Sequence, residues 1–187
     1  MSNKLFKELK LIVGEKNILK DLKDLEIYNK DWRGFYNNKS LFVVFPKSTN
    51  TLKKIVNYCY ERNIKIVPQG GNTSLTGASV PSYNKEEIIV NFSKMNKVLE
   101  LDKSNLTILV EPGLILDRLK EYLDKENLYF PIDLSSSGSC MIGGNIATNA
   151  GGINALKYGS MKDNVIGLEI VAGEGSILTS LSKIEKK

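Results

Sequence analysis

One glycine-rich stretch contains residue types that suit anion binding. It reads Pro68-Gln69-Gly70-Gly71-Asn72-Thr73-Ser74-Leu75-Thr76-Gly77 and follows a β-branched run, residues 64–67, that is typical of a buried strand. Paired glycines can adopt positive φ and leave no Cβ in the way of a close ligand, and consecutive backbone N–H groups can form an anion-binding nest. The stretch therefore predicts a diphosphate cradle or, because turns also use Gly and Asn, a plain turn.

A second cluster of small residues lies between residues 131 and 152. It contains Pro131-Ile132-Asp133-Leu134, Gly138-Ser139-Cys140-Met141-Ile142-Gly143-Gly144-Asn145 and Ala147-Thr148-Asn149-Ala150-Gly151-Gly152. Small residues let the backbone approach a flat ligand closely, although they also permit tight helix packing. Because its glycines stand beside Asn, Ser and Thr, the cluster favours a ligand site.

The composition excludes several classes of chemistry. The 187 residues contain no histidine, which rules out Ser-His-Asp catalysis, Cys-His catalysis and a histidyl base or metal ligand within this sequence. We assign no catalytic residue and expect no metal site. A Walker motif is excluded because Ala78-Ser79 follow Gly77 where Lys-Ser/Thr would be required, and the G-x-G-x-x-G pattern is absent.

Charge and hydropathy indicate neither a nucleic-acid platform nor a membrane span. The net charge of +5 comes from scattered lysines, and no apolar run is long enough to cross a bilayer. The first ten residues are polar and lysine-rich, unlike a secretory signal. We therefore expect a cytoplasmic location.

The predicted elements place the first glycine-rich stretch at the end of a strand. We expect a helix from residue 2 to 13, a buried strand at 41–45 and a helix that begins after Ser48 or Thr49. That helix presents an apolar stripe with Cys59 on it, so a core role is expected for this cysteine. With the strand at 64–67 it forms a β-α-β unit, predicted to be parallel and right-handed, and ligand sites in α/β folds open where such strands end.

The second half of the chain is predicted to be rich in short strands. They are expected at residues 87–90, 98–101, 107–110 and 165–171, the last entering a hairpin at Glu174-Gly175 that leads into 177–178. A helix is expected around residues 115–123. Upstream, Asp31-Trp32-Arg33-Gly34 stands in a charged, aromatic segment, where Trp32 is expected to anchor a loop or, alternatively, to cover a ligand.

These segments, in this order, resemble the FAD-binding domain of the vanillyl-alcohol oxidase/p-cresol methylhydroxylase type, and within it the D-2-hydroxyglutarate and D-lactate dehydrogenase branch. The likeness rests on Asp31 to Gly34, Val67 to Thr73, Pro131 to Cys140 and Ile142 to Gly152. It implies an α+β fold of two subdomains: an N-terminal helix and connecting segment (1–40), subdomain 1 (41–92) and an incomplete subdomain 2 (93–187). The family's substrate-binding cap domain is absent from this sequence, so the resemblance covers an N-terminal part only.

The resemblance implies FAD as cofactor and assigns its contacts. From the first loop these are Pro68, Gln69, Gly70, Gly71, Asn72, Thr73, Ser74 and Leu75. From the second cluster they are Pro131, Asp133, Leu134, Gly138, Ser139, Gly143, Gly144, Asn145, Thr148, Asn149 and Gly151. Some relatives bond flavin through a histidine at the position of Asn72 or through a cysteine, for which Cys140 is a formal candidate. The surrounding pattern matches the non-covalent branch, so non-covalent FAD is expected.

The implied reaction is oxidation of a D-2-hydroxy acid, D-2-hydroxyglutarate or D-lactate, to the 2-oxo acid by hydride transfer to flavin N5. Electrons would then pass to a quinone or an electron-transfer protein. Two alternatives stay open: a glycolate oxidase-type subunit, and a catalytically incomplete FAD-binding module that needs a partner chain.

Overall fold

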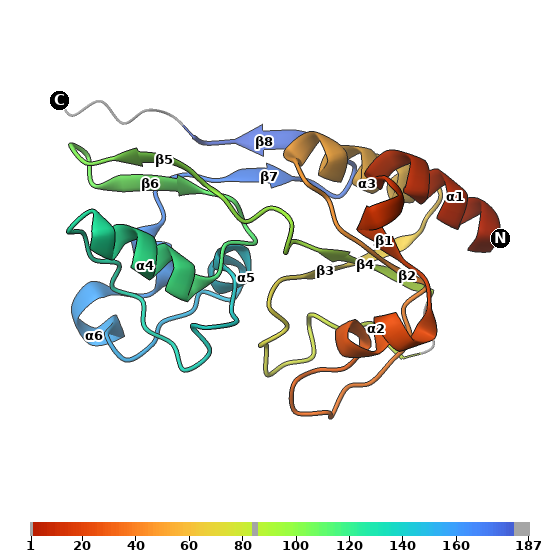
Figure 1. Ribbon diagram of the computed structural model, residues 1–187, viewed down its shortest axis with the longest axis horizontal. Helices are drawn as coiled ribbons and strands as arrows, with labels where there is room; N and C mark the ends of the chain where they lie inside the picture. The colour runs from red at the N-terminus through yellow and green to blue at the C-terminus, as the bar shows by residue number, and fades with distance from the viewer. Residues whose placement is uncertain (1, 84–85, 182–187) are drawn as a thin grey trace. The chain divides into compact units, whose positions relative to one another are not determined.

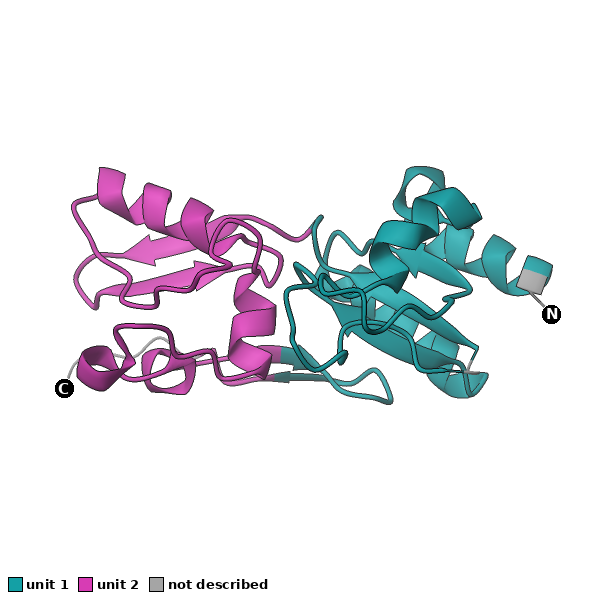
Figure 2. Cartoon of the chain, turned by 90° about the horizontal axis from the view of Figure 1, so that it is seen from below, with its two compact units in different colours: residues 1–94, 170–178 teal, residues 95–169, 179–187 magenta. Residues whose placement is uncertain are grey.

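The computed structural model describes residues 2–83 and 86–181 of the chain, which divide into two compact units (Figure 2). The first unit contains the residues up to Lys94 together with Ile170–Leu178, and the second contains Met95–Glu169 and the residues from Thr179 onward. The predicted division near residue 92 lies close to this one, but residues 170–178, which were expected in subdomain 2, belong to the first unit. Helices and strands mix as the predicted α+β class requires, and this class is confirmed.

A sheet of mostly parallel strands forms the first unit (Figure 1). Its strands are β1 (Ile18–Leu19), β2 (Phe42–Val44), β3 (Lys65–Gln69) and β4 (Glu87–Asn91), in the spatial order β1-β2-β4-β3. The strand β4 pairs in parallel with both β2 and β3, whereas β1 runs antiparallel to β2. The predicted parallel β-α-β unit therefore exists, but β2 and β3 do not pair, because β4 lies between them.

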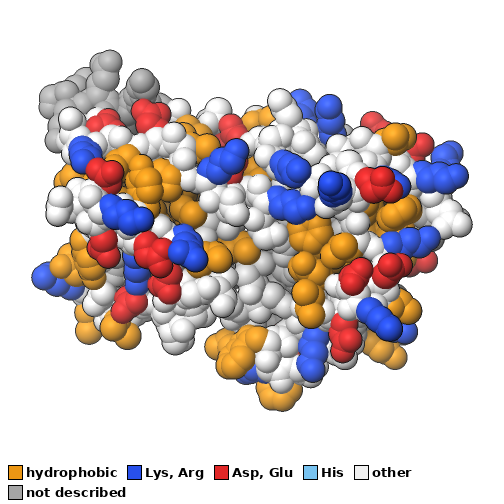
Figure 3. Space-filling model, in the orientation of Figure 1, with side chains coloured by type: hydrophobic (Ala, Val, Ile, Leu, Met, Phe, Trp, Pro, Cys, Tyr) orange, Lys and Arg blue, Asp and Glu red, His pale blue; other side chains and the backbone are white. Residues whose placement is uncertain are grey.

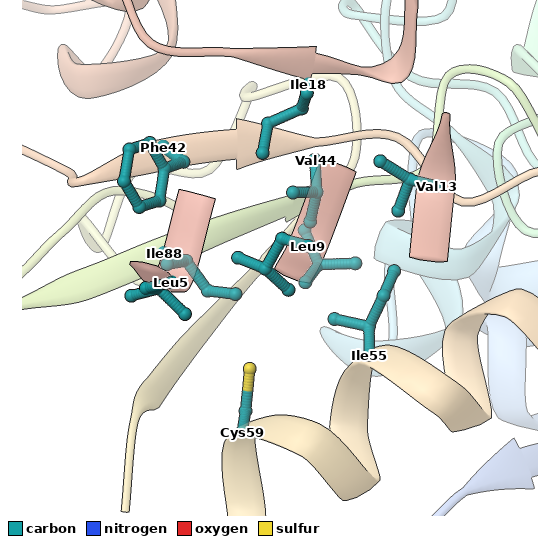
Figure 4. Packing of buried hydrophobic residues seen from close by; sticks show 10 residues of the cluster. Leu5, Leu9, Val13, Ile18, Phe42, Val44, Ile55, Cys59 and Ile88 are labelled. Carbon is teal, nitrogen blue, oxygen red and sulfur yellow. The ribbon is translucent and has the colours of Figure 1, made fainter. Parts of the chain in front are cut away.

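Helices cover both faces of this sheet, which is why its strands alternate between two buried clusters. Phe42 and Val44 pack with Ile88 against α1 (Ser2–Val13) and α3 (Thr49–Glu61), as Figure 4 shows. The intervening residues Val43 and Ile89 pack on the other face with Leu25 of α2 (Leu22–Asn29). Successive side chains of a strand point to opposite faces, so parallel strands buried on both faces need continuous apolar runs.

Local signals set where α3 begins. The Ser48 hydroxyl accepts a hydrogen bond from the Thr51 backbone N–H at 3.2 Å, so the predicted serine cap is confirmed. The helix then buries Ile55, Val56 and Cys59 on one stripe. A short 3-10 turn, η1 (Glu15–Asn17), links α1 to β1.

The second unit is built around an antiparallel pair and short helices. β5 (Val98–Asp102) pairs with β6 (Thr107–Val110), and α4 (Leu116–Lys125) buries Leu116, Leu119 and Leu123 in its core. α5 (Ile142–Ala147), α6 (Ala155–Tyr158) and the 3-10 turn η2 (Met161–Asn164) follow.

The predicted hairpin near residue 175 is present, but its first strand is shorter than expected. β7 (Glu169–Val171) pairs with β8 (Ile177–Thr179), and the Ser180 N–H donates to the Leu168 carbonyl at 2.8 Å. Residues 165–168 lie outside the strand, although Leu168 is hydrogen-bonded to Ser180 just beyond β8. Over the described ranges, no helix has both the length and the apolar character that crossing a membrane needs.

Candidate functional site

The first glycine-rich stretch leaves the carboxyl end of β3, as expected for a ligand-binding loop. β3 extends to Gln69, so Pro68 and Gln69 belong to the strand and the loop proper begins at Gly70. Gln69 is 1% exposed, and its side-chain amide donates to the carbonyls of Tyr28 (2.8 Å) and Ser79 (2.7 Å). Its Oε1 accepts from Asn91 at 3.1 Å. The Gln69 side chain thus ties the start of the loop to its end and has no group free for a ligand.

Asn72 holds the middle of the loop in an unusual backbone conformation. Its φ is 54°, its Nδ2 donates to the Lys30 carbonyl at 2.7 Å, and its Oδ1 accepts from the Ser79 hydroxyl at 2.7 Å. Asn tolerates the left-handed region better than other non-glycine residues, and this amide is further held by two bonds. The loop's second residue at positive φ is Gly77 (71°).

The paired glycines Gly70 and Gly71 do not adopt the positive φ that glycine can adopt. Neither Gly70 nor Gly71 has a left-handed backbone, so the loop does not need glycine there for its turn. Glycine at both positions also leaves no Cβ in the way of a close approach by another group. The turn therefore does not account for the paired glycines, and the diphosphate cradle stays a prediction.

In the second half of the loop, a side-chain hydroxyl bonds to the loop's own backbone. Ser74 stands where the resembled branch usually has glycine, and its hydroxyl accepts from the Thr76 backbone N–H at 3.3 Å. Leu75 is exposed, and its carbonyl accepts a hydrogen bond from Arg33.

Trp32, which was expected to anchor a loop, is 65% exposed, so the anchoring role is wrong. The neighbouring Arg33 holds the loop instead.

In the second unit, the two ends of the small-residue cluster lie side by side. Asp133 forms a parallel bridge with Gly152, and the Ile153 N–H donates to the Asp133 carbonyl at 3.2 Å. Gly152 has φ 82°, and a Cβ on it would meet the Asp133 oxygen at 2.0 Å. This contact requires glycine at 152, a residue that the site prediction did not include although the Gly151-Gly152 pair in the sequence signalled it.

Three predicted polar side chains of this cluster are engaged within the protein. Asn145 is buried and donates to the Cys140 sulfur at 3.4 Å, while the Thr148 hydroxyl donates to the Gly144 carbonyl at 2.9 Å. Asn149 accepts from the Ser160 hydroxyl and the Lys162 N–H, both at 2.9 Å. These side chains shape the backbone, and ligand contacts from them would have to use remaining lone pairs or the main chain.

The two adjacent glycines of α5 have different reasons to be glycine. A Cβ on Gly143 would meet the Pro112 Cβ at 2.7 Å, so packing within the protein explains this residue. A Cβ on Gly144 would meet no protein atom within 4 Å. Gly144 therefore borders open space, which fits a residue that leaves room for a ligand.

The remaining predicted residues form the rim of the cluster, and one unpredicted residue joins them. Lys120 of α4 makes an ion pair with Asp133 at 2.6 Å. The Pro131 carbonyl accepts from Asn154 at 3.2 Å. The other rim positions make local contacts: Leu134, Gly138, Ser139 and Gly151. Lys120 was missed because nothing in a helical sequence pattern says which residue thirteen positions later it will face.

A surface pocket of about 420 Å³ lies elsewhere in the first unit, between α3, β3 and residues 171–173. Its lining is apolar and includes Ile66, Phe92 and Cys59. Of the predicted site residues, Pro68 lines it. This pocket lies on the sheet face that α3 covers, and its lining residues include no charged side chain that would pair with a phosphate.

The fold matches that of a solved structure. The structure of p-cresol methylhydroxylase with substrate bound superposes with a TM-score of 0.80 at 23% identity, covering 95% of this chain and 35% of that one. This likeness shows a shared fold. Residues 40–180 match the FAD binding domain family, and the chain belongs to that family. The predicted resemblance and the predicted cofactor, FAD, are confirmed.

Sequence comparison gives the branch. The chain is 43% identical over 181 residues to the mitochondrial D-2-hydroxyglutarate dehydrogenase of Arabidopsis thaliana, covering 97% of this chain and 32% of that protein. It is 38% identical over 166 residues to a putative mitochondrial D-lactate dehydrogenase of Schizosaccharomyces pombe, covering 89% of this chain and 31% of that protein. The chain therefore spans about a third of the length of these relatives. The expected cytoplasmic location is wrong by this comparison, because both relatives are named mitochondrial proteins.

Proposed function

We propose that this chain is the cofactor-binding part of a dehydrogenase that oxidises a D-2-hydroxy acid, D-2-hydroxyglutarate or D-lactate, to the 2-oxo acid. The observation that carries the proposal is the loop after β3, in which the Gln69 and Asn72 side chains are hydrogen-bonded to the protein and the paired glycines carry no side chain. The substrate class is supported by the names of the relatives, which are dehydrogenases of these two acids.

The proposed FAD contacts are made by the backbone groups of the two glycine-rich segments. Backbone N–H groups between Gly70 and Leu75 would hold the diphosphate, as consecutive amides do in anion-binding nests. For the second unit, the resemblance assigns contacts to Asp133, Gly144 and Gly151, and Gly144 borders open space. Gln69, which was expected to contact FAD, positions the loop instead, because its side-chain amide is bonded to the Tyr28 and Ser79 carbonyls.

Non-covalent attachment is supported by the state of the two candidate bonding positions. Both functional groups of the Asn72 amide are hydrogen-bonded to the protein, and an amide does not bond flavin. The Cys140 thiol is 2% exposed and packs in the core of the second unit. Neither position therefore offers an accessible group that could form a covalent bond to flavin.

FAD, when bound, supplies the acceptor for the hydride of the substrate C2–H bond, and the protein contributes binding, orientation and electrostatics. The loops described above bind and orient it. These 187 residues contain no histidine, so they do not themselves supply an imidazole base for the hydroxyl proton. Electrons would pass on to a quinone or an electron-transfer protein.

Substrate oxidation is tested on the protein as it is made in its own cells. Under anaerobic conditions, D-2-hydroxyglutarate or D-lactate should bleach the visible flavin band, and L-2-hydroxyglutarate, the matched enantiomer, should not. Bound FAD that neither D-acid reduces would contradict the substrate class and leave the FAD site standing.

The mode of attachment is tested separately by acid precipitation of flavin-loaded protein. A non-covalent cofactor is released when the protein unfolds, so the yellow colour should stay in the supernatant. Flavin that remains with the washed pellet would show a covalent bond and contradict this part of the proposal.

A further inference from the structure

A second segment of the first unit runs alongside the predicted diphosphate loop. Residues 28–38 and 69–81 are joined in the same order along both segments by four side-chain-to-backbone hydrogen bonds. The pairs are Gln69 to the Tyr28 carbonyl (2.8 Å), Asn72 to the Lys30 carbonyl (2.7 Å), Arg33 to the Leu75 carbonyl and Asn38 to the Pro81 carbonyl (2.8 Å). The turn after α2 and the loop between β3 and β4 lie beside one another in Figure 1. Residues 28–38 thus form a wall of the loop.

A tight turn fixes where Arg33 stands in this wall. The Asp31 N–H donates to the Tyr36 carbonyl at 2.9 Å, and the Tyr36 N–H donates back to the Asp31 carboxylate at 2.8 Å. Gly34 closes the turn at φ 74°, with its N–H on the Asp31 carbonyl at 2.9 Å. The Arg33 guanidinium lies over the Phe35 ring at 4.8 Å. Asp31 is buried, so the turn presents Arg33 and not this carboxylate at its surface.

The loop itself lacks the positive charge that a diphosphate calls for. Residues 68–84 contain no charged side chain. Arg33 brings one to Leu75, and the Lys30 side chain lies along the same turn, where a Cβ on Gly34 would meet its Cε at 3.0 Å. Figure 3 shows basic side chains beside hydrophobic ones at this lower edge of the first unit. A guanidinium has five donors, so one bond to a carbonyl leaves others for phosphate oxygens.

We infer that Arg33 binds the diphosphate of FAD as well as the loop. This inference rests on the proposed FAD site. The simpler reading is that Arg33 only tethers the loop through Leu75. The two roles of Arg33 differ in whether its positive charge matters. A tether to the Leu75 carbonyl needs only a hydrogen-bond donor, whereas binding an anionic diphosphate also needs the positive charge.

The test uses the 187-residue chain with substitutions Arg33→Gln and Arg33→Lys, and Arg62→Gln as the matched control. Arg62 belongs to the same unit but stands at the other end of β3 from the loop, where it pairs with Glu61. FAD affinity is measured by flavin fluorescence over a range of salt concentrations, with ADP as a flavin-free competitor. Circular dichroism and thermal unfolding check that each variant is folded.

Arg33→Gln should weaken FAD and ADP binding by about ten- to a hundredfold, the range for a charge-assisted hydrogen bond, and should flatten the salt dependence. Arg33→Lys should recover much of the affinity and the salt slope, and Arg62→Gln should match the unsubstituted chain. Equal losses in Arg33→Gln and Arg33→Lys with an unchanged salt slope would reduce Arg33 to a tether, and full affinity in Arg33→Gln would exclude any role. An unsubstituted chain that binds neither FAD nor ADP would overturn the proposed function and this inference with it.

Discussion

Within one loop, the glycines and the asparagine have separable roles. Asn72 and Gly77 carry the positive φ values, and the ring of Tyr36 lies where a Gly77 Cβ would be, at 2.6 Å. Gly70 and Gly71 do not have positive φ, so the turn does not account for their lack of a side chain, and the proposed ligand would. Substitution at Gly71 and at Gly77 should therefore fail in different ways.

Gly71→Val should abolish FAD binding while leaving the fold intact, because a branched side chain would occupy the space for the diphosphate. Gly77→Val should lower the free energy of unfolding by roughly 1–3 kcal/mol, since it combines a positive φ with a clash against Tyr36. Flavin content after gel filtration and thermal unfolding separate the two. Unchanged flavin content in Gly71→Val would argue decisively against the placement of the diphosphate.

At the scale of elements, α3 illustrates how strongly a sequence pattern can specify packing. Its apolar stripe buries Ile55 and Cys59 against β2 and β4, as Figure 4 shows, and the predicted core role of Cys59 fits its full burial. Burial raises the pKa of the Cys59 thiol from 9.0 to about 12. The folded state therefore holds this proton more tightly than the unfolded state does.

Because the folded pKa is the higher one, the contribution of Cys59 to stability is complete below about pH 9 and decreases as the pH rises towards 12. Between pH 8 and 10.5, the unsubstituted chain should lose about 2 kcal/mol more unfolding free energy than Cys59→Ala, which cannot titrate there. Urea denaturation at both pH values measures this, and comparison with the variant cancels the titration of lysines and tyrosines. Parallel pH profiles would contradict a buried neutral thiol.

For the whole molecule, family membership rests on matched order as well as on local motifs. Each glycine-rich segment is ambiguous alone, but the family match covers residues 40–180 and includes both clusters. The cytoplasmic location expected from the sequence was wrong. The lack of a secretory-type apolar segment and the scattered distribution of lysines do not specify which compartment a protein reaches. The names of relatives overturned it.

The sequence by itself determined the elements and the cofactor class. Apolar periodicity located α3 and the strands near 42, 66 and 88, and the ordered glycine clusters indicated FAD. These signals are local, or depend only on residue order along the chain.

Tertiary structure decided which side chains of those motifs are available. Only the fold shows that β4 separates β2 from β3. It also shows that the side-chain amides of Gln69 and Asn72 donate hydrogen bonds to the carbonyls of Tyr28 and Lys30. It also brings Arg33 to a loop 42 positions away. Hydrogen bonds at such separations depend on how helices and strands pack, and a pattern of residue types does not record that.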